Sequence, residues 1–209
     1  MTRIIGGSAG GRRLQTPRGE RTRPTSDRVR EALFSAVESW AGSWAGLRVV
    51  DLYAGSGALG LEARSRGAER VTLVEHDRPT ARLIAANART LGMDGVEVRA
   101  EKVRGALDRG PSEREDGDRE HDLVLADPPY PMGEEELARD LEALPGWLAP
   151  GALVVLERSS RSPEPRWPEG VTTLRSRRYG ETTLWYGLAA SPGPGSPGDV
   201  ATAAAGAAR

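Results

Sequence analysis

The fold is decided by residues 49–60, which read Val49-Val50-Asp51-Leu52-Tyr53-Ala54-Gly55-Ser56-Gly57-Ala58-Leu59-Gly60. The apolar beginning is typical of a buried strand, and the acid and glycines after it are typical of a ligand-binding turn. Gly55 and Gly57 can take positive φ, which lets the backbone approach a ligand closely. Residues 58–66 have the composition of a helix whose N-terminus faces that ligand. We therefore predict a strand, a binding loop and a helix.

The glycine spacing by itself leaves the ligand open. Gly55-x-Gly57-x-x-Gly60 also satisfies the dinucleotide fingerprint, with Glu75 at a plausible distance for a ribose contact. A tight turn in an ordinary α/β protein fits the same residues. A second motif is needed to identify the class of ligand.

Length and composition predict one soluble domain. The chain has 209 residues, of which 38% are hydrophobic and 28% charged. No apolar run approaches the roughly 18 residues that span a bilayer, and the N-terminus does not resemble a signal peptide, so we expect a cytoplasmic protein. The absence of cysteine excludes disulfides, thiolate metal sites and a cysteine nucleophile. With only His76 and His121 as imidazoles, we expect no metal.

The charge is unevenly distributed. Residues 1–30 hold eight arginines against two acids, so this segment carries +6, and the remainder carries −7 because the whole chain carries −1. A basic segment on an acidic body is typical of a protein that holds a polyanion. We expect residues 3–23 to form a small, loosely packed β-hairpin or arm. Arg28 and Arg30 lie off the apolar face of the helix that follows, where they would be solvated or contact phosphates.

From Leu47 onward, apolar strands alternate with amphipathic helices, which predicts a parallel sheet covered on both faces. The predicted strands are 47–52, 70–75, 95–99, 122–126 and 151–157. The predicted helices are one whose N-cap is Thr25 or Ser26, then 57–66, 78–91, 102–109 and 134–145. Residues 171–179 and 182–188 predict a closing hairpin, residues 110–120 a solvated loop, and residues 191–209 a disordered tail.

The second motif follows the fourth predicted strand, which ends in Asp127-Pro128-Pro129-Tyr130. Two prolines remove two backbone donors and fix φ twice, so the chain leaves the sheet as a rigid extended segment. In an α/β sheet this point is the carboxyl edge, where ligands bind. We therefore expect an acid, a proline carbonyl and an aromatic ring beside the glycine loop.

These three groups suit the exocyclic amine of a nucleobase. Such a nitrogen is a poor nucleophile because its lone pair is delocalised into the ring. Asp127 and the Pro128 carbonyl would accept hydrogen bonds from its two N–H groups and favour the pyramidal geometry in which the lone pair can attack an electrophilic carbon. Tyr130 would stack on the base and hold it in line. Hydride transfer has no use for this arrangement.

In combination, these motifs resemble the class I S-adenosylmethionine-dependent methyltransferases that modify amino groups. The chain from Arg3 to Leu188 is similar to the RsmD family of 16S ribosomal RNA guanine-N2 methyltransferases. The stretches that carry this closer resemblance are Arg3-Ile4-Ile5-Gly6-Gly7, residues 23–34, residues 51–60 with Arg66-Gly67-Ala68, Asp127-Pro128-Pro129-Tyr130, and Tyr179-Gly180. The tail after Ala190 and residues 111–120 fall outside the pattern.

The resemblance implies a Rossmann-like α/β fold, with a mostly parallel seven-stranded sheet, helices on both faces and an N-terminal basic β-hairpin arm. It implies an RNA-binding arm at 1–25, a methyltransferase domain at 26–188 and a disordered tail at 189–209. The cofactor would be S-adenosylmethionine, held by Asp51, Tyr53, Ala54, Gly55, Gly57, Glu75 and Glu101. Glu75 would take the ribose hydroxyls, and Glu101 stands where the family tends to place an aspartate against the adenine.

The activity implied is methylation of the N2 amine of one guanine in 16S ribosomal RNA of the 30S subunit, by a monomer. The catalytic residues would be Asp127, Pro128 and Tyr130. The RNA contacts would come from Arg3, Arg12, Arg13, Arg23, Arg28 and Arg30. Two alternatives stay open: an amino-methyltransferase acting on DNA adenine or cytosine or on a glutamine amide, and a non-catalytic RNA-binding protein of ribosome assembly.

Overall fold

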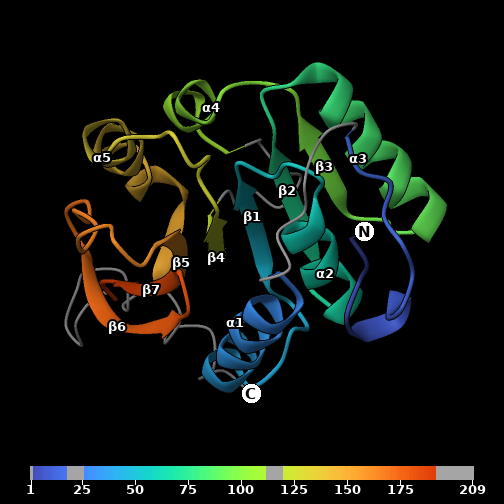
Figure 1. Ribbon diagram of the computed structural model, residues 1–209, viewed down its shortest axis with the longest axis horizontal. Helices are drawn as coiled ribbons and strands as arrows, with labels where there is room; N and C mark the ends of the chain where they lie inside the picture. Colours follow the sequence, from blue (N-terminus) through green and yellow to red (C-terminus); the bar gives the residue numbers. More distant parts are fainter. Residues whose placement is uncertain (1, 18–25, 112–119, 192–209) are drawn as a thin grey trace, which may run out of the picture.

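A computed structural model describes residues 2–17, 26–111 and 120–191, and its centre is a seven-stranded sheet of order β3-β2-β1-β4-β5-β7-β6 (Figure 1). The strands are β1 (Arg48–Leu52), β2 (Arg70–Val74), β3 (Val96–Arg99), β4 (His121–Ala126), β5 (Leu148–Ser159), β6 (Val171–Tyr179) and β7 (Thr182–Ala189). Strands β1 to β5 pair in parallel, whereas β7 runs antiparallel to both β5 and β6. The predicted mostly parallel sheet with a closing hairpin is confirmed.

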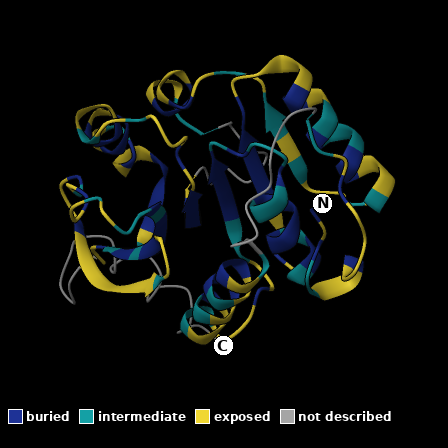
Figure 2. Ribbon diagram, in the orientation of Figure 1, coloured by how far each residue is buried: buried dark blue, intermediate teal, exposed yellow. Residues whose placement is uncertain are grey.

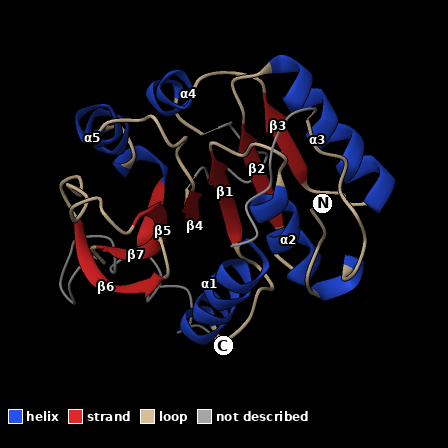
Figure 3. Cartoon of the chain, viewed as in Figure 1, coloured by secondary structure: helices blue, strands red, loops and turns tan. Residues whose placement is uncertain are grey.

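The helices lie close to their predicted positions (Figure 3). They are α1 (Ser26–Ala41), α2 (Ala58–Arg66), α3 (Arg78–Leu91), α4 (Val103–Arg109) and α5 (Glu134–Glu142), with short 3-10 turns η1 (Gly7–Ala9) and η2 (Pro145–Trp147). The helix expected over 134–145 stops at Glu142, because Pro145 has no N–H to continue it and begins η2 instead. None of the helices within the described ranges is long and apolar enough to cross a membrane.

Two hydrophobic cores cover the two faces of the sheet. Val49 of β1 faces the core shared with α1, α2 and α3, whereas its neighbour Val50 faces the core shared with α4, α5 and η2. Successive strand residues point to opposite faces, so a strand covered on both sides reads as a continuous apolar run. Figure 2 shows the central strands as almost entirely buried. This is why the carboxyl ends of the strands, rather than either face, carry the polar side chains of the site.

The N-terminal segment differs from the loosely packed arm that we predicted. It does turn back on itself, with an antiparallel bridge between Arg3 and Arg13. However, Ile4 and Leu14 are buried in the core beside α2. The buried Glu62 of α2 accepts hydrogen bonds from the backbone N–H of Ile5 and of the next residue, at 2.6 and 2.8 Å. The hairpin was predicted correctly, but the loose packing was wrong, because two isolated apolar residues gave no sign that α2 offers them a site.

The docked segment also explains a local glycine requirement. Gly7 has φ +74, and a Cβ at this position would lie 1.9 Å from the Ser65 carbonyl oxygen of α2. Only glycine permits this close approach. Residues 18–25, the centre of the acidic loop at 112–119 and the tail from 192 lie outside the described residues. The predictions for Arg23 and for most of the C-terminal tail therefore remain predictions.

Candidate active site

The glycine loop between β1 and α2 has the strained geometry expected of a binding loop. Tyr53, Gly55 and Gly57 have φ of 61°, 53° and 79°. A Cβ on Gly57 would lie 2.9 Å from Cγ2 of Ile84. The backbone here therefore sits against α3 and leaves no room for a side chain. Positive φ at Tyr53, a residue other than glycine, costs free energy and marks a conformation that the surrounding contacts impose.

Asp51, near the end of β1, is hydrogen-bonded to the helix that follows this loop. It is buried, and its Oδ2 accepts a hydrogen bond of 2.8 Å from the backbone N–H of Gly60 in α2. The pKa of its carboxyl is raised to about 8, mainly by burial and also by the negative charges of Asp127 and Glu75, while the Gly60 hydrogen bond acts in the opposite direction. Three acids are thus close enough to interact at this edge of the sheet.

Glu75 follows β2 and closes the other side of the loop. Its Oε2 accepts from the Gly55 N–H at 2.8 Å, and its Oε1 accepts from the Asp77 N–H at 2.7 Å. Each carboxylate oxygen has more than one lone pair, so these contacts leave acceptor capacity for a hydroxyl. The structure therefore brings Glu75 to the loop, as the sequence predicts; its contact with ribose stays a prediction.

This acidic edge fits S-adenosylmethionine in its chemistry. The cofactor is cationic at sulfur and at its amino group, and its ribose offers two hydroxyl donors. Burial is the main cause of the raised pKa of Asp51, and the negative charges of Asp127 and Glu75 add to it, so these two carboxylates lie close enough to favour a bound cation. A dinucleotide, with its anionic pyrophosphate, would meet repulsion at the same place.

Glu101, the residue predicted to contact the adenine, already has partners in the protein. Glu101 follows β3, and its Oε1 accepts from Arg99 Nε at 2.8 Å while its Oε2 lies 2.9 Å from Arg109 Nη1. Both carboxylate oxygens therefore face guanidinium groups. An adenine amine would have to share the carboxylate with them, and this assignment remains a prediction.

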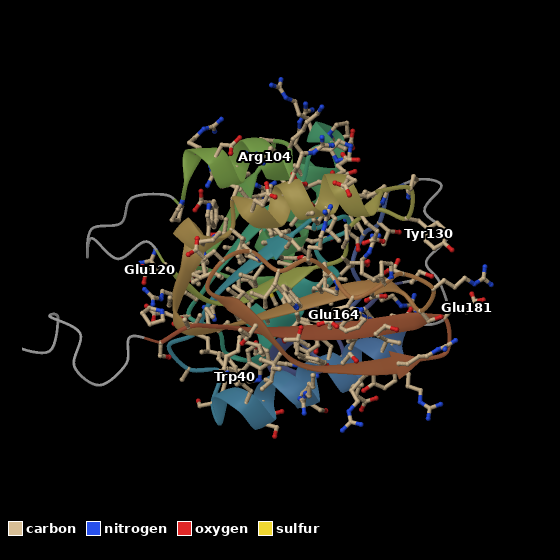
Figure 4. All side chains as sticks on the ribbon, turned by 90° about the vertical axis from the view of Figure 1, so that its left-hand side faces the viewer. Trp40, Arg104, Glu120, Tyr130, Glu164 and Glu181 are labelled. Carbon is tan, nitrogen blue, oxygen red and sulfur yellow. The ribbon has the colours of Figure 1, made fainter. Side chains whose placement is uncertain are left out.

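The Asp127-Pro128-Pro129-Tyr130 segment leaves β4 next to the glycine loop. Leu52 of β1 and Ala126 of β4 are paired in the sheet, so the loops that begin at Tyr53 and Asp127 start side by side. Asp127 is exposed and Tyr130 keeps 68% of its surface exposed. Figure 4 shows Tyr130 projecting from this edge of the molecule. The aromatic ring is therefore accessible to an incoming base.

A pocket of about 300 Å³ opens at this segment. Its wall is formed by the segment that begins at Asp127, the end of β5, the turn after β5 and the start of β7. The lining residues are Asp127, Pro128, Tyr130, Met132, Glu134, Glu157, Arg158, Ser159, Arg161, Ser162 and Thr182. The volume lies at the low end of the range typical of small-ligand sites, which suits a single base rather than a polymer.

Sequence reasoning missed Arg158, which shapes this pocket. It is buried at the end of β5, and its Nη2 donates to the Met132 carbonyl oxygen at 3.2 Å and pairs with Glu134 Oε1 at 2.5 Å. These contacts hold the segment that follows Tyr130. Its position could have pointed to it, because Arg158 is the second-last residue of the strand next to β4, at the carboxyl edge where ligands bind.

The predicted phosphate-binding arginines divide into two groups. Arg13 and Arg28 are exposed, as is Arg3, whose Nε lies 3.3 Å from Asp27 Oδ2. Arg12 is also exposed and donates to the Thr90 carbonyl oxygen at 2.9 Å. These side chains remain candidates for RNA contacts.

For Arg30 the prediction was wrong. Its side chain is only 7% exposed, and its Nη2 donates to the carbonyl oxygen of Arg3 at 3.0 Å and to Asp27 Oδ1 at 2.6 Å. This hydrogen bond from Arg30 is the main reason that the pKa of Asp27 is lowered. Arg30 therefore fastens the N-terminal segment to α1 and has no free surface to offer a phosphate.

The sheet order, the glycine loop and the Asp-Pro-Pro-Tyr segment at adjacent strand ends define a class I S-adenosylmethionine-dependent methyltransferase. Residues 2–187 match the family model described as conserved hypothetical protein 95. The chain belongs to this family, the RsmD family.

Individual relatives agree with this assignment. The chain is 36% identical to ribosomal RNA small subunit methyltransferase D of Escherichia coli strain K12, over 86% of this chain and 85% of the relative. The protein of the same name from Haemophilus influenzae is 34% identical, over 85% and 89%. A solved Escherichia coli structure, described as a proposed methyltransferase, superposes with a TM-score of 0.77 at 31% identity, covering 91% of this chain and 99% of that one.

Proposed function

We propose that this protein transfers the methyl group of S-adenosylmethionine to the exocyclic N2 amine of one guanine in small-subunit ribosomal RNA. The observation that carries the proposal is the pairing of Leu52 with Ala126, which places the glycine loop and the Asp127 segment side by side. A cofactor on the first loop and a base on the second would meet across this junction.

The cofactor supplies an electrophilic methyl carbon on a sulfonium. Asp127 and the Pro128 carbonyl oxygen would accept hydrogen bonds from the two N–H groups of the amine, so that the nitrogen lone pair could form the new N–C bond as the S–C bond breaks. The nitrogen then carries one proton too many, and the Asp127 carboxylate is placed to accept it. Tyr130 stacks on the base and holds the amine in line.

The substrate is inferred from the relatives and from charge. The proteins named ribosomal RNA small subunit methyltransferase D are 34–36% identical to this chain over most of their length. The N2 position of guanine is what membership of the RsmD family implies. Exposed Arg3, Arg12, Arg13 and Arg28 would add phosphate contacts. The enzyme would act as a cytoplasmic monomer on the RNA of the 30S subunit, with residues 26–188 as the catalytic domain.

The test is transfer of tritiated methyl groups from S-adenosylmethionine to three substrates: small ribosomal subunits that lack the modification, naked small-subunit RNA, and duplex DNA. Nucleoside analysis should recover the label as N2-methylguanosine. Label in DNA would leave the chemistry in place and overturn the substrate. Cofactor binding without transfer to any of the three would favour the non-catalytic assembly protein.

The variant Asp127→Ala tests the role assigned to this carboxylate. Transfer should fall by at least a hundredfold, because a group that orients the nucleophile and accepts its proton is lost. The free energy of unfolding should stay close to that of the parent protein, since Asp127 is exposed, and cofactor binding should persist through the glycine loop and Glu75. Unimpaired transfer by this variant would refute the role of Asp127.

A further inference from the structure

The outer strand of the sheet, β6, carries a group of arginines that the methyltransfer chemistry does not use. Its residues 172–178 are all exposed, and three of the last four are arginines: Arg175, Arg177 and Arg178. The β6–β7 hairpin, residues 171–189, contains Glu181 as its single acid, so the hairpin carries +2. We refer to these three arginines as the β6 arginine strip.

The strip has a defined orientation. The guanidinium of Arg175 lies 4.8 Å from the centre of the Tyr186 ring. The charge of Arg177 also reaches this tyrosine, since both arginines oppose the rise in its pKa that burial causes. Arg175 and Arg177 therefore lie on the side of the hairpin that Tyr186 faces. Arg178, the next residue of the strand, points to the opposite face, and its Nε donates to the Gly180 carbonyl oxygen at the turn of the hairpin.

Among the described residues, no acid neutralises the guanidinium groups of the strip. Within residues 2–17, 26–111 and 120–191, no carboxylate forms an ion pair with any of the three. This contrasts with Arg104, Arg109 and Arg166 elsewhere on the surface, each of which pairs with an acid. An unneutralised guanidinium retains its full capacity for a phosphate, which it can bind through two parallel hydrogen bonds.

The strip leads to the mouth of the base pocket. Tyr179, the residue after Arg178, pairs with Thr182, and Thr182 pairs in turn with Ser159 of β5. Thr182 and Ser159 both line the pocket with Tyr130. Figure 4 shows Tyr130 and Glu181, at the tip of the hairpin, on the same side of the molecule. The arginines are therefore arranged along the strand that reaches the edge where the target base enters.

We propose that the β6 arginine strip binds backbone phosphates of the RNA strand that presents the target base. The proposal rests on the proposed function and extends it. It adds a second basic surface to that of the N-terminal arginines, at the edge of the sheet opposite β3. A base held in a pocket of about 300 Å³ leaves its flanking nucleotides outside. Their phosphates would meet a strip of the opposite charge beside the pocket.

A different role for these arginines is protection of an exposed strand. Charged side chains on an edge strand discourage pairing with a second chain, and Leu174 in the same strand is 49% exposed. The two roles predict different measurements. Protection affects solubility and self-association, whereas phosphate binding affects RNA affinity and its dependence on salt.

The experiment compares the parent protein with Arg175→Gln/Arg177→Gln, the two arginines on the side of the hairpin that Tyr186 faces. The matched control is Arg104→Gln/Arg139→Gln, which removes the same charge from the exposed surface of α4 and α5. Affinity for a small-subunit RNA fragment is measured by fluorescence anisotropy at several salt concentrations. The β6 variant should bind about tenfold more weakly, and its slope of log affinity against log salt should fall by about 1.5, which corresponds to two lost phosphate contacts. The control should stay within about twofold of the parent.

Methyl transfer supplies the second readout. The β6 variant should show a raised KM for RNA with little change in kcat, because neither arginine contacts the reacting atoms, and its cofactor affinity should be unchanged. Equal losses of RNA affinity in the two double variants, or an unchanged salt slope, would refute phosphate binding by the strip and leave the proposed methyltransferase function standing. A parent protein that neither binds nor methylates this RNA would overturn the proposed function and, with it, the strip.

Discussion

The hydroxyl of Tyr53 donates a hydrogen bond of 2.6 Å to Oδ2 of Asp140, which joins the loop after β1 to α5. Tyr53 has φ 61, a conformation that residues other than glycine rarely adopt. Helix α5 follows the Asp127 segment in the chain, so this one bond connects the cofactor side of the site with the base side. It also supplies a contact that holds Tyr53 in its unfavourable conformation.

We predict that Tyr53→Phe lowers both stability and cofactor affinity. The substitution leaves the largely buried Asp140 carboxylate without this donor, which should lower the free energy of unfolding by about 1–2 kcal/mol. Urea denaturation measures the loss, and calorimetry should show a severalfold weaker binding of S-adenosylmethionine. Tyr186→Phe is the control, because the buried Tyr186 hydroxyl has no hydrogen-bond partner among the described residues and its removal should cost nothing. Similar losses in both variants would contradict this role of the bond.

Asp51 gives the protein a pH-dependent stability. Its folded pKa of about 8 lies above the ordinary value of 3.8, so between these two pH values the folded state binds the proton and the unfolded state does not. Stability due to this group is therefore complete below about pH 4 and declines as pH rises towards 8. Asp51→Asn should abolish this decline and leave the variant more stable than the parent by a few kcal/mol at pH 9. Urea unfolding at pH 5, 7 and 9 tests it; parallel profiles for the two proteins would refute the shift.

Gly60 and Gly105 form a matched pair, since both lie in helices. A Cβ on Gly60 would lie 2.7 Å from Leu73 Cδ2 and 3.1 Å from Asp51 Oδ2, whereas one on Gly105 would meet only Glu101 Oε2 at 3.9 Å. Gly60→Ala should therefore destabilise the protein by about 1–3 kcal/mol through overpacking. Gly105→Ala should stabilise it by about 0.5–1 kcal/mol through helix propensity. Thermal unfolding of the two variants should move the midpoint in opposite directions.

Glu62 anchors the N-terminal segment, and Glu62→Gln tests the anchor. The amide can replace one acceptor oxygen but turns an N–H towards a backbone donor, so the free energy of unfolding should fall by about 2–3 kcal/mol. Hydrogen exchange at Ile5 and Gly6 should accelerate more than exchange in α3. Glu38→Gln is the control: Glu38 is 57% exposed and lies 3.9 Å from Arg66, so its loss should cost less than about 0.5 kcal/mol. Uniform acceleration across the chain would show global destabilisation rather than release of the segment.

The sequence by itself determined the order of the elements, the sheet and the two loops of the site. Hydrophobic periodicity and turn chemistry are local properties, and they identify strand ends such as Asp51 and Asp127 directly. Parallel strands place their carboxyl ends at one edge, so these local signals were enough to predict which residues meet there.

Only the tertiary structure decided what each polar side chain contacts. Arg30 is spaced along the sequence like a surface residue, yet it is buried against Asp27 and the Arg3 carbonyl oxygen. Glu62 accepts two backbone donors more than fifty residues away, and Arg158 reaches back to Met132. Such contacts join residues far apart in the chain, and their energies depend on burial and on distances of about 3 Å. No periodicity encodes either quantity, which is why the N-terminal arm, the wall of the base pocket and the β6 arginine strip emerged only once the chain was folded.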